Sequence, residues 1–127
     1  MPQTSKGKHR VLGASPKENR YSNKAIKLLI ENGFYVTPIH PNFDEIENLK
    51  VIKKLTEIAR PIDTLTLYIN AKKIESELDK IVSIKPNRVI FNPGAESKLL
   101  QKELDKNKIE WIEGCTLVML KTKSFLK

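Results

Sequence analysis

The sequence contains one cysteine, Cys115, two histidines and few aromatic residues (6%). A single cysteine cannot form an internal disulfide bond, and one cysteine with two histidines lacks the ligand spacing of a zinc site. A chain without disulfides is typical of a reducing compartment, so we expect a cytoplasmic protein. No apolar run approaches the roughly 18 residues that cross a bilayer, and the polar first residues lack a signal-peptide core. We therefore expect neither a membrane span nor a secretory signal.

Positive charge is in surplus, with 23 Lys and Arg against 15 Asp and Glu and a net charge of +8. Such a surplus attracts phosphorylated metabolites, nucleic acids or membrane surfaces. The lysines form only short clusters, at Lys53–Lys54, Lys72–Lys73 and Lys121 with Lys123. No basic run alternates with aromatic residues, so stacking platforms for bases are scarce and nucleic-acid binding is unlikely. The other explanation of the lysines, solvated helix faces, is the preferred one.

The 127 residues fit a single domain. We expect a flexible segment over residues 1–8 and a folded domain over 9–127. Strands are expected at 10–13, 34–39, 64–69, 88–91 and 109–112, with a possible short strand at 51–52 flanked by turns of helix. Helices are expected at 22–32, 71–84 and 96–106, and residues 116–126 as a strand or a short helix.

The ends of these elements carry specific signals. Ser22 is a candidate N-cap, and Gly33 is a candidate for the left-handed residue that follows a helix. Pro38 lies inside an expected strand, which favours the end of that strand or the edge of a sheet.

Strands that alternate with helices at this spacing predict an α/β fold with a mostly parallel sheet. Right-handed crossovers then give a doubly wound, Rossmann-like sandwich of three layers. In such sheets ligands bind at the carboxyl ends of the strands, where the strand order reverses.

Small and polar residues follow each expected strand, at the carboxyl ends where a ligand would bind. They are Gly13-Ala14-Ser15-Pro16, His40-Pro41-Asn42, Asn70, Asn92-Pro93-Gly94-Ala95 and Glu113-Gly114-Cys115-Thr116. Either these residues only make the turns that the fold needs, or they surround a binding crevice.

The first of these loops is the most informative. Gly13 allows a sharp turn, the following helix offers free N–H groups, and Ser15, Arg20 and Ser22 add donors, which together suit a phosphate. The dinucleotide fingerprint G-x-G-x-x-G is not met, because Ser15 and Glu18 stand where its later glycines belong. A Walker loop is also absent. The loop therefore predicts a phosphate site that is not a standard NAD site.

Several segments resemble the small bacterial CoA-binding proteins, whose fold is similar to the CoA-binding domain of the succinyl-CoA synthetase alpha subunit. The resemblance covers nearly all of the chain after Lys8, and the Pro-Gly-Ala-Glu and Gly-Cys-Thr segments are its more specific parts. The segments that carry it are 11–16, 19–22, 38–41, 62–70, 86–96 and 113–120.

The resemblance implies that CoA, or an acyl-CoA, lies across the strand exits. It implies a diphosphate site in the 13–22 loop, a ribose site after the second strand and a pantetheine side after the fourth. The implied binding residues are Gly13, Ala14, Ser15, Pro16, Arg20, Tyr21 and Ser22 for the diphosphate loop, and His40, Pro41 and Asn42 beside the ribose and its phosphate. Ile69 and Asn70 would border the adenine or the pantetheine, and Pro93, Gly94 and Ala95, with Cys115, would lie toward the pantetheine.

Three functions stay open at this point. The first is a non-enzymatic module that binds CoA or acyl-CoA, with a protein partner possible but unknown. The second is a small enzyme of thioester or NAD(P) chemistry that uses His40 and Cys115, since a Cys–His pair would activate the thiolate. The third is nucleic-acid binding.

The positions of four single residues predict their roles. Cys115 is either a buried small apolar residue or a thiol that forms a reversible mixed disulfide with a ligand thiol. His9 is expected on the surface at a strand entrance and Trp111 in the core. Glu96 is expected to stabilise a helix start.

Overall fold

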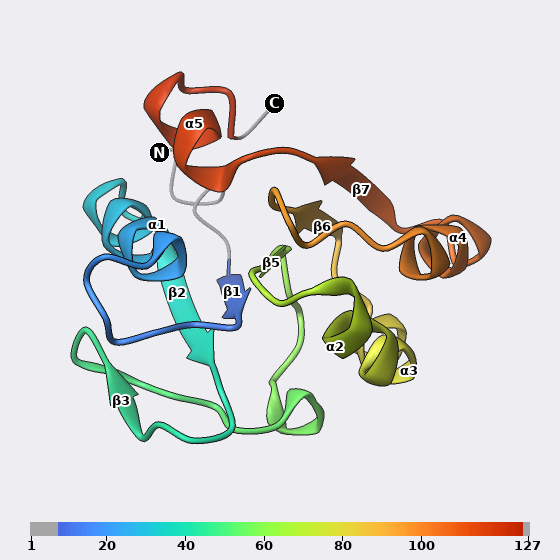
Figure 1. The fold of residues 1–127 in the computed structure, drawn as a ribbon, viewed down its shortest axis with the longest axis horizontal. Helices are drawn as coiled ribbons and strands as arrows, with labels where there is room; N and C mark the ends of the chain where they lie inside the picture. The colour runs from blue at the N-terminus through green and yellow to red at the C-terminus, as the bar shows by residue number, and fades with distance from the viewer. Residues whose placement is uncertain (1–7, 126–127) are drawn as a thin grey trace.

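A computed structural model describes residues 8–125 and shows a parallel sheet of five strands (Figure 1). The strands of this sheet are β1 (Lys8–Leu12), β2 (Tyr35–Ile39), β5 (Thr64–Leu67), β6 (Arg88–Phe91) and β7 (Glu110–Glu113). The helices are α1 (Tyr21–Glu31), α2 (Ala71–Ser76), α3 (Leu78–Ser83), α4 (Lys98–Lys106) and α5 (Thr116–Lys121). A hairpin of β3 (Glu45–Ile46) and β4 (Leu49–Lys50) and a 3₁₀ turn, η2 (Leu55–Glu57), join β2 to β5.

The strand order β2-β1-β5-β6-β7 confirms the predicted doubly wound α/β fold. The chain leaves β1 in one direction to form β2, and it then returns past β1 to form β5. The order therefore reverses between β1 and β5, which is the position where such sheets bind ligands. The second expected strand is indeed at the sheet edge, as Pro38 predicted, because β1 is the only one of the other four strands that pairs with β2.

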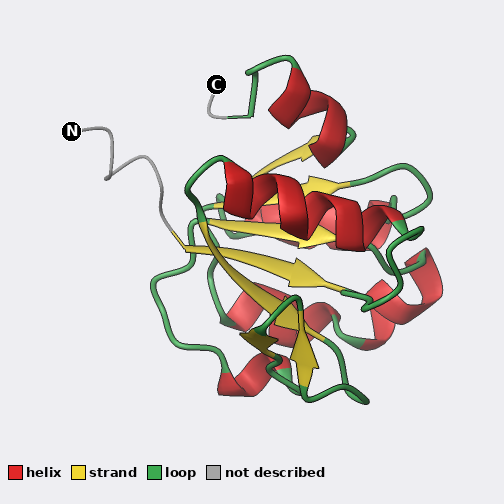
Figure 2. Cartoon of the chain, turned by 90° about the vertical axis from the view of Figure 1, so that its left-hand side faces the viewer, coloured by secondary structure: helices red, strands yellow, loops and turns green. Residues whose placement is uncertain are grey.

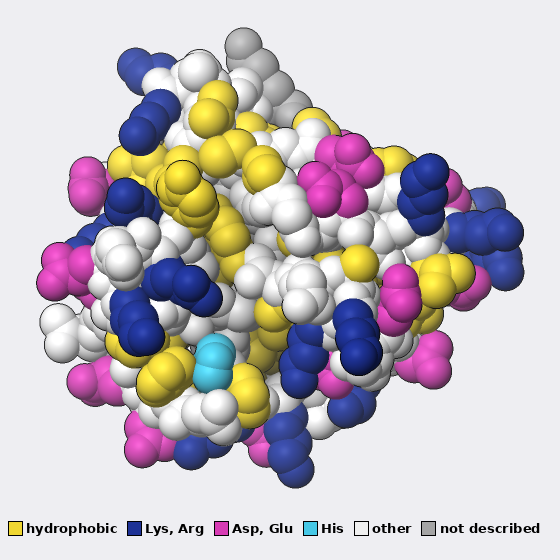
Figure 3. Space-filling view, viewed as in Figure 1, with side chains coloured by type: hydrophobic (Ala, Val, Ile, Leu, Met, Phe, Trp, Pro, Cys, Tyr) yellow, Lys and Arg dark blue, Asp and Glu magenta, His cyan; other side chains and the backbone are white. Residues whose placement is uncertain are grey.

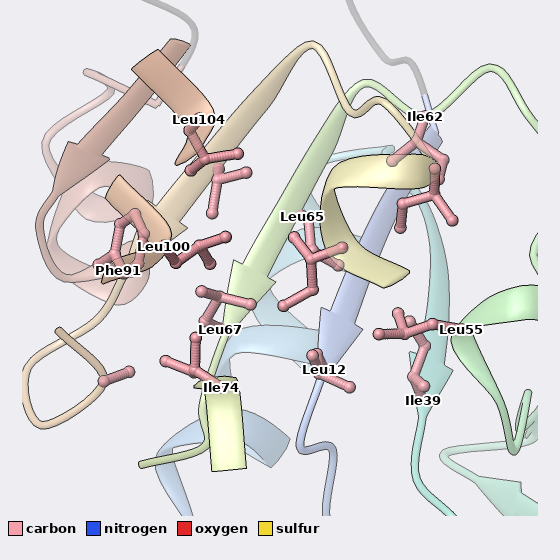
Figure 4. Close-up of a cluster of buried hydrophobic side chains, with 14 of the residues drawn as sticks. Leu12, Ile39, Leu55, Ile62, Leu65, Leu67, Ile74, Phe91, Leu100 and Leu104 are labelled. Carbon is pink, nitrogen blue, oxygen red and sulfur yellow. The ribbon is translucent and has the colours of Figure 1, made fainter. Parts of the chain in front are cut away.

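Helices cover both faces of the sheet, so the molecule has three layers (Figure 2). On one face, side chains of β1, β5 and β6 pack with η2, α2, α3 and α4 in a cluster that includes Leu55, Leu67, Ile74, Phe91 and Leu104 (Figure 4). On the other face, α1 and α5 close a second cluster, of which Ile26, Leu29, Ile90 and Leu120 are members. Because both faces of the sheet are covered, even the polar residues Thr64 and Thr66 of β5 are fully buried.

The segment between β2 and β5 differs from the prediction. The expected turn of helix before residue 51 is instead the β3–β4 hairpin, in which Glu47 and Asn48 have φ values of 52° and 64°. Two residues in the left-handed region are what a tight hairpin turn requires, and Asn tolerates this region well. The possible strand at 51–52 is reduced to one parallel bridge between Ile52 and Ile39.

Two predicted helices also have different bounds. The expected helix over 71–84 is two helices, because Glu77 has φ −109° and its amide bonds Ile74 O, only three residues back. The first helix begins at Tyr21 after the N-cap residue Arg20, so Ser22 is not the cap but a buried residue of the first turn. Gly33 does adopt the predicted left-handed conformation, with φ 83°. The tail forms the short helix α5.

His9 is buried, contrary to the prediction of a surface residue. Its exposure is 0%, and its ring packs 4.6 Å from the Phe34 ring and 5.3 Å from the Phe125 ring. The reason is that β1 is an interior strand whose amino end is covered by these two aromatic side chains. Trp111, predicted in the core, is half-buried on the edge strand β7 and donates from Nε1 to Asp105 Oδ1 at 2.8 Å.

The expected flexible segment lies outside the described residues except for Lys8, which β1 already includes. Within residues 8–125, no helix is both long and apolar enough to span a bilayer.

Candidate functional site

A pocket of about 890 Å³ opens at the carboxyl ends of β1, β2 and β5, where the strand order reverses. The loop after β1 forms one wall, and the residues after β2 form another. Tyr68 and Ile69, directly after β5, line the pocket between these two walls. Residues 53–56 line a further side. The pocket therefore stands where a doubly wound sheet is expected to hold its ligand.

Gly13 is required where β1 enters the pocket. It has φ 89°, and a Cβ atom built on it would lie 2.7 Å from Tyr68 O and 2.8 Å from Ile69 Cγ2. The amides of Gly13 and Ala14 both donate to Ile39 O, at 3.1 and 3.2 Å. These two amides thus hold the loop against β2, and donors for an anion must come from further along the loop.

The start of α1 offers such donors. A smaller pocket of about 330 Å³ is lined by Asn19, Arg20, Tyr21 and Ser22, and it shares Gly13, Arg20 and Tyr68 with the larger pocket. No side chain caps α1. The amides of Asn23 and Lys24 donate to Arg20 O, at 3.1 and 3.2 Å, which leaves those of Tyr21 and Ser22 as donors at the positive end of the helix. This end of the helix can therefore bind an anion beside the Arg20 guanidinium.

His40 follows β2 and is half-buried at the pocket. Its Nδ1 accepts a hydrogen bond from Asn42 N at 3.0 Å, and its ring lies 4.4 Å from the ring of Phe43. Burial, with a smaller contribution from the charge of Lys73, lowers the pKa of His40. The neutral imidazole is therefore the stable form at neutral pH, with Nδ1 as an acceptor.

The larger pocket is strongly basic. Six cationic side chains line it, against one carboxylate, that of Glu77. The six are Lys17, Arg20, Lys53, Lys54, Lys73 and Lys80. In Figure 3, dark blue Lys and Arg side chains lie on both sides of the histidine that this face exposes. A concave site lined by one sign of charge raises the local concentration of an oppositely charged ligand.

The structure brings together most, but not all, of the predicted binding residues. Those lining the two pockets are Gly13, Ala14, Ser15, Arg20, Tyr21, Ser22, His40, Pro41, Asn42 and Ile69. Those outside both linings are Pro16, Asn70, Pro93, Gly94, Ala95 and Cys115. Asn70 caps α2 by accepting from Lys73 N at 2.9 Å, which is a structural role.

His40 and Cys115 do not form a pair. His40 follows the edge strand β2, whereas Cys115 lies beyond β6, because Gly114 N donates to Phe91 O at 3.0 Å and Thr116 N donates to Asn92 Oδ1 at 2.8 Å. Cys115 is half-buried rather than fully buried, and it does not line the pocket that contains His40. The structure therefore does not place the Cys115 thiol in the pocket beside His40, as the enzymatic alternative expects.

Cys115 instead belongs to a polar group beyond β5 and β6. Asn92, 1% exposed, donates from Nδ2 to Leu67 O at 2.9 Å and accepts from Thr116 N at 2.8 Å, and so ties α5 to the sheet. Tyr68, directly after β5, is a neighbour of this group, and burial raises its pKa. Glu96, predicted to stabilise a helix start, accepts from Gly94 N at 3.1 Å, and α4 begins two residues later.

The sequence interpretation missed the residues that the segment between β2 and β5 and helices α2 and α3 contribute to the pocket. The lysine pairs at 53–54 and 72–73 were visible as clusters, but nothing in the sequence placed them beside the first loop. Residues 8–125 contain no group of three side chains suited to hold a metal ion.

Fold and pocket together define a doubly wound α/β domain with an anion-attracting site at its switch point, which is the arrangement of nucleotide-binding domains. Residues 8–121 match the family model described as CoA binding domain, and the chain belongs to this family. The match supports CoA binding in general.

Three relatives give the range of similarity. A crystal structure of an uncharacterized protein is 41% identical, with a TM-score of 0.83 over 93% of this chain and 97% of that one. A cell-free-expressed protein from Thermus thermophilus is 21% identical with a TM-score of 0.87 (96% and 92% covered), and it shares the fold. Uncharacterized protein YneT of Bacillus subtilis is 28% identical over 64 residues, which are 50% of this chain and 47% of that protein. The chain thus matches about half of the length of this curated relative.

Proposed function

We propose that the chain is a non-enzymatic module that binds CoA or an acyl-CoA in the pocket at the switch point. The diphosphate is bound by the start of α1 and Arg20, and the adenosine side lies toward His40, Pro41 and Asn42. Ile69 borders the ligand between them. The cytoplasm, where CoA is used, is the proposed location.

The observation that carries this proposal is the charge of the pocket. Six cations and one carboxylate surround a space of about 890 Å³, at the point of the sheet that binds ligands in this fold class. CoA carries a diphosphate and a phosphomonoester, so a pocket of this charge suits it. Family membership adds independent support.

The absence of catalysis is proposed from the geometry of His40. This residue lies at the pocket, but its Nδ1 already accepts a hydrogen bond from Asn42 N, and Cys115 does not line the pocket. An acid or base without a nucleophile and an orienting partner does not make an acyl-transfer site.

Isothermal titration calorimetry with CoA, acetyl-CoA, NAD and NADP tests the proposal. We expect CoA or acetyl-CoA to bind and NAD to bind much more weakly. Arg20→Gln should lower CoA affinity about tenfold, since a charge-assisted hydrogen bond to a phosphate is lost. The matched control is Lys8→Gln, which removes one positive charge at the opposite end of β1 and should leave the affinity unchanged. Failure of both CoA and acetyl-CoA to bind would refute the proposal.

A further inference from the structure

One side chain of helix α1 joins the loop that follows β1 to the β3–β4 hairpin. We call residues 13–20 the glycine loop. Asn23 is 0% exposed, and its Nδ2 donates both to Ser15 O at 2.9 Å and to Glu47 Oε2 at 3.1 Å. Ser15, in the glycine loop, lines the larger pocket, whereas Glu47, at the turn of the hairpin, lines neither pocket. Glu47 is thus linked through Asn23 to the wall that a ligand meets.

The neighbours of Asn23 determine the orientation of its carboxamide. Ser15 O and the ionised carboxylate of Glu47 can only accept hydrogen bonds. If the carboxamide were rotated by half a turn, Oδ1 would face both of these oxygens in a fully buried position, which is unfavourable. The NH₂ group therefore faces the loop and the hairpin, although Asn23 Oδ1 then has no hydrogen-bond partner among the described residues. This one side chain sets the distance between the loop and the hairpin.

The hydrogen bonds continue from Ser15 along the glycine loop to Arg20. Ser15 Oγ accepts from Lys17 N at 3.1 Å, and Lys17 O accepts from Arg20 N at 3.1 Å. Ser15, Lys17 and Arg20 all line the larger pocket. The place of Arg20, to which the proposed function assigns the diphosphate, therefore depends on Ser15, whose carbonyl group Asn23 holds.

The hairpin that carries Glu47 is anchored in the core. Figure 1 shows it, labelled β3, beside the blue loop that follows β1. Ile46, 1% exposed, and Ala14, 0% exposed, belong to the same buried cluster on the α1 face of the sheet. Val51 N donates to Asp44 O at 3.0 Å and closes the base of the hairpin. The hairpin is thus a fixed support for the glycine loop.

The charge of Glu47 opposes the binding of an anion. None of the ion pairs within residues 8–125 includes Glu47, so its carboxylate is not neutralised by a cation there. A carboxylate this close to the pocket wall repels an anionic ligand. If Glu47 acted only through its charge, its removal would strengthen the binding of an anion. If it acts through Asn23, its removal weakens that binding, so the two effects have opposite signs.

We propose that Glu47 and Asn23 are positioning residues for the anion-binding loop. Glu47 orients the carboxamide of Asn23, Asn23 holds Ser15 O, and the glycine loop is thereby preorganised for the diphosphate of the ligand. A preorganised loop binds more tightly because it loses less conformational freedom on binding. This inference rests on the proposed function and goes beyond it, because it assigns an effect on affinity to a residue outside both pockets.

Calorimetric titration of Glu47 variants with CoA tests this inference. Glu47→Ala should bind CoA roughly fivefold more weakly than the parent, although it removes a negative charge. Glu47→Gln keeps an acceptor oxygen at the same distance along the side chain and should bind CoA at least as tightly as the parent. The matched control, Glu45→Ala, removes the same charge from an exposed position of the same hairpin and should not weaken binding.

Two further variants separate positioning from charge and from folding. Glu47→Asp keeps the charge and tolerates the left-handed φ of 52°, but its carboxylate is one methylene shorter, so it should bind CoA as weakly as Glu47→Ala. In an Asn23→Ala background, Glu47→Ala should no longer weaken binding, because the connection through which Glu47 acts is already lost. Urea denaturation shows that each variant is folded under the conditions of the titration.

The outcomes separate this inference from the proposed function. A CoA affinity of Glu47→Ala at or above that of the parent overturns the positioning role and leaves CoA binding intact. The same holds if Glu47→Asp and Glu47→Gln bind CoA equally well, a comparison that stands even where Glu47→Ala does not fold. A parent protein that binds neither CoA nor acetyl-CoA overturns the proposed function, and the positioning role with it.

Discussion

Gly13 is the residue on which the shape of the pocket most depends. It combines a left-handed φ of 89° with close contact to the backbone of Tyr68 and the side chain of Ile69. Its amide, like that of Ala14, bonds Ile39 O, so this one residue fixes the exits of β1, β2 and β5 relative to one another. Only glycine meets both the conformational and the steric requirement.

Gly13→Ala should therefore destabilise the protein by about 3 kcal/mol, the sum of a positive φ and a steric collision. Gly94→Ala is the matched control, because Gly94 has the same φ of 89° but nothing within 4 Å of an added Cβ. The control should lose only about 1 kcal/mol. Urea denaturation measures both values. Equal losses in the two variants would contradict the steric part of this account.

His40 should titrate below its ordinary value of 6.5, because burial, and to a smaller extent Lys73, lower its pKa. Lys73→Gln should raise the pKa of His40 part of the way back, since burial remains. NMR titration of the His40 Cε1 proton measures both. A value at or above 6.5 in the parent would contradict the prediction.

The lowered pKa of His40 also makes the free energy of unfolding depend on pH. Below pH 6.5 the unfolded chain takes up a proton at His40 before the folded chain does, so the free energy of unfolding decreases as pH falls. The contribution of His40 is thus present above pH 6.5 and is lost below it. Compared with the parent, His40→Gln should show a smaller loss of stability between neutral and mildly acidic pH, as measured by urea denaturation at each pH.

At the scale of elements, the helix starts differ in how their amides are satisfied. Asn70 caps α2 and Ser97 caps α4, each by accepting from the amide three residues ahead. Helix α1 has no side-chain cap, and its first turn opens onto a pocket. Helices α3 and α5 also lack a side-chain cap, so it is the pocket at its first turn, together with the missing cap, that makes the start of α1 available to a ligand.

Ser97→Ala should cost about 1 kcal/mol of stability, because the buried Ser97 Oγ accepts from Leu100 N at 3.2 Å. Arg20→Ala, at the equivalent position of α1, should change the stability of the unliganded protein by less than about 0.5 kcal/mol, as for surface residues without a specific contact. Urea denaturation of the two variants side by side makes the comparison. A loss at Arg20 as large as that at Ser97 would show that Arg20 acts as a cap after all.

The elements that the sequence predicted well are those whose pattern is local. Alternation of strands and helices gave the doubly wound sheet, Pro38 gave an edge strand, and Gly33 gave a helix end. The break at Glu77 and the β3–β4 hairpin were missed. Apolar spacing continues across Glu77, and the hairpin depends on Glu47 and Asn48 adopting positive φ, which the residue types permit but do not require.

At the scale of the whole molecule, the glycine loop and the strand exits could be predicted because topology alone brings them to one edge. Lys53, Lys54 and Lys73 could not be assigned to the site from the sequence, because their positions depend on how the segment between β2 and β5 folds back against β2. Pro93, Gly94 and Ala95 are at the same edge, but the pocket ends at the exit of β5.

The net charge of +8 does not show where the positive charge lies, whereas the structure places part of it around the pocket. Six cations meet one carboxylate around the pocket, so the affinity for CoA should fall as salt screens these charges. We expect a loss of roughly tenfold between low and high ionic strength, with Debye lengths of about 10 Å at 0.1 M and about 3 Å at 1 M. Calorimetric titrations across this range measure the loss.

Pantetheine, the uncharged part of CoA, is the control ligand, because its binding should respond little to salt. The variant Lys54→Gln/Lys73→Gln should show a shallower salt dependence for CoA than the parent, since it retains fewer of the charges that salt screens. A CoA affinity that stays constant with salt would mean that the cations around the pocket face solvent without acting on the ligand. The attraction would then have to come from hydrogen bonds of the loop and the start of α1 alone.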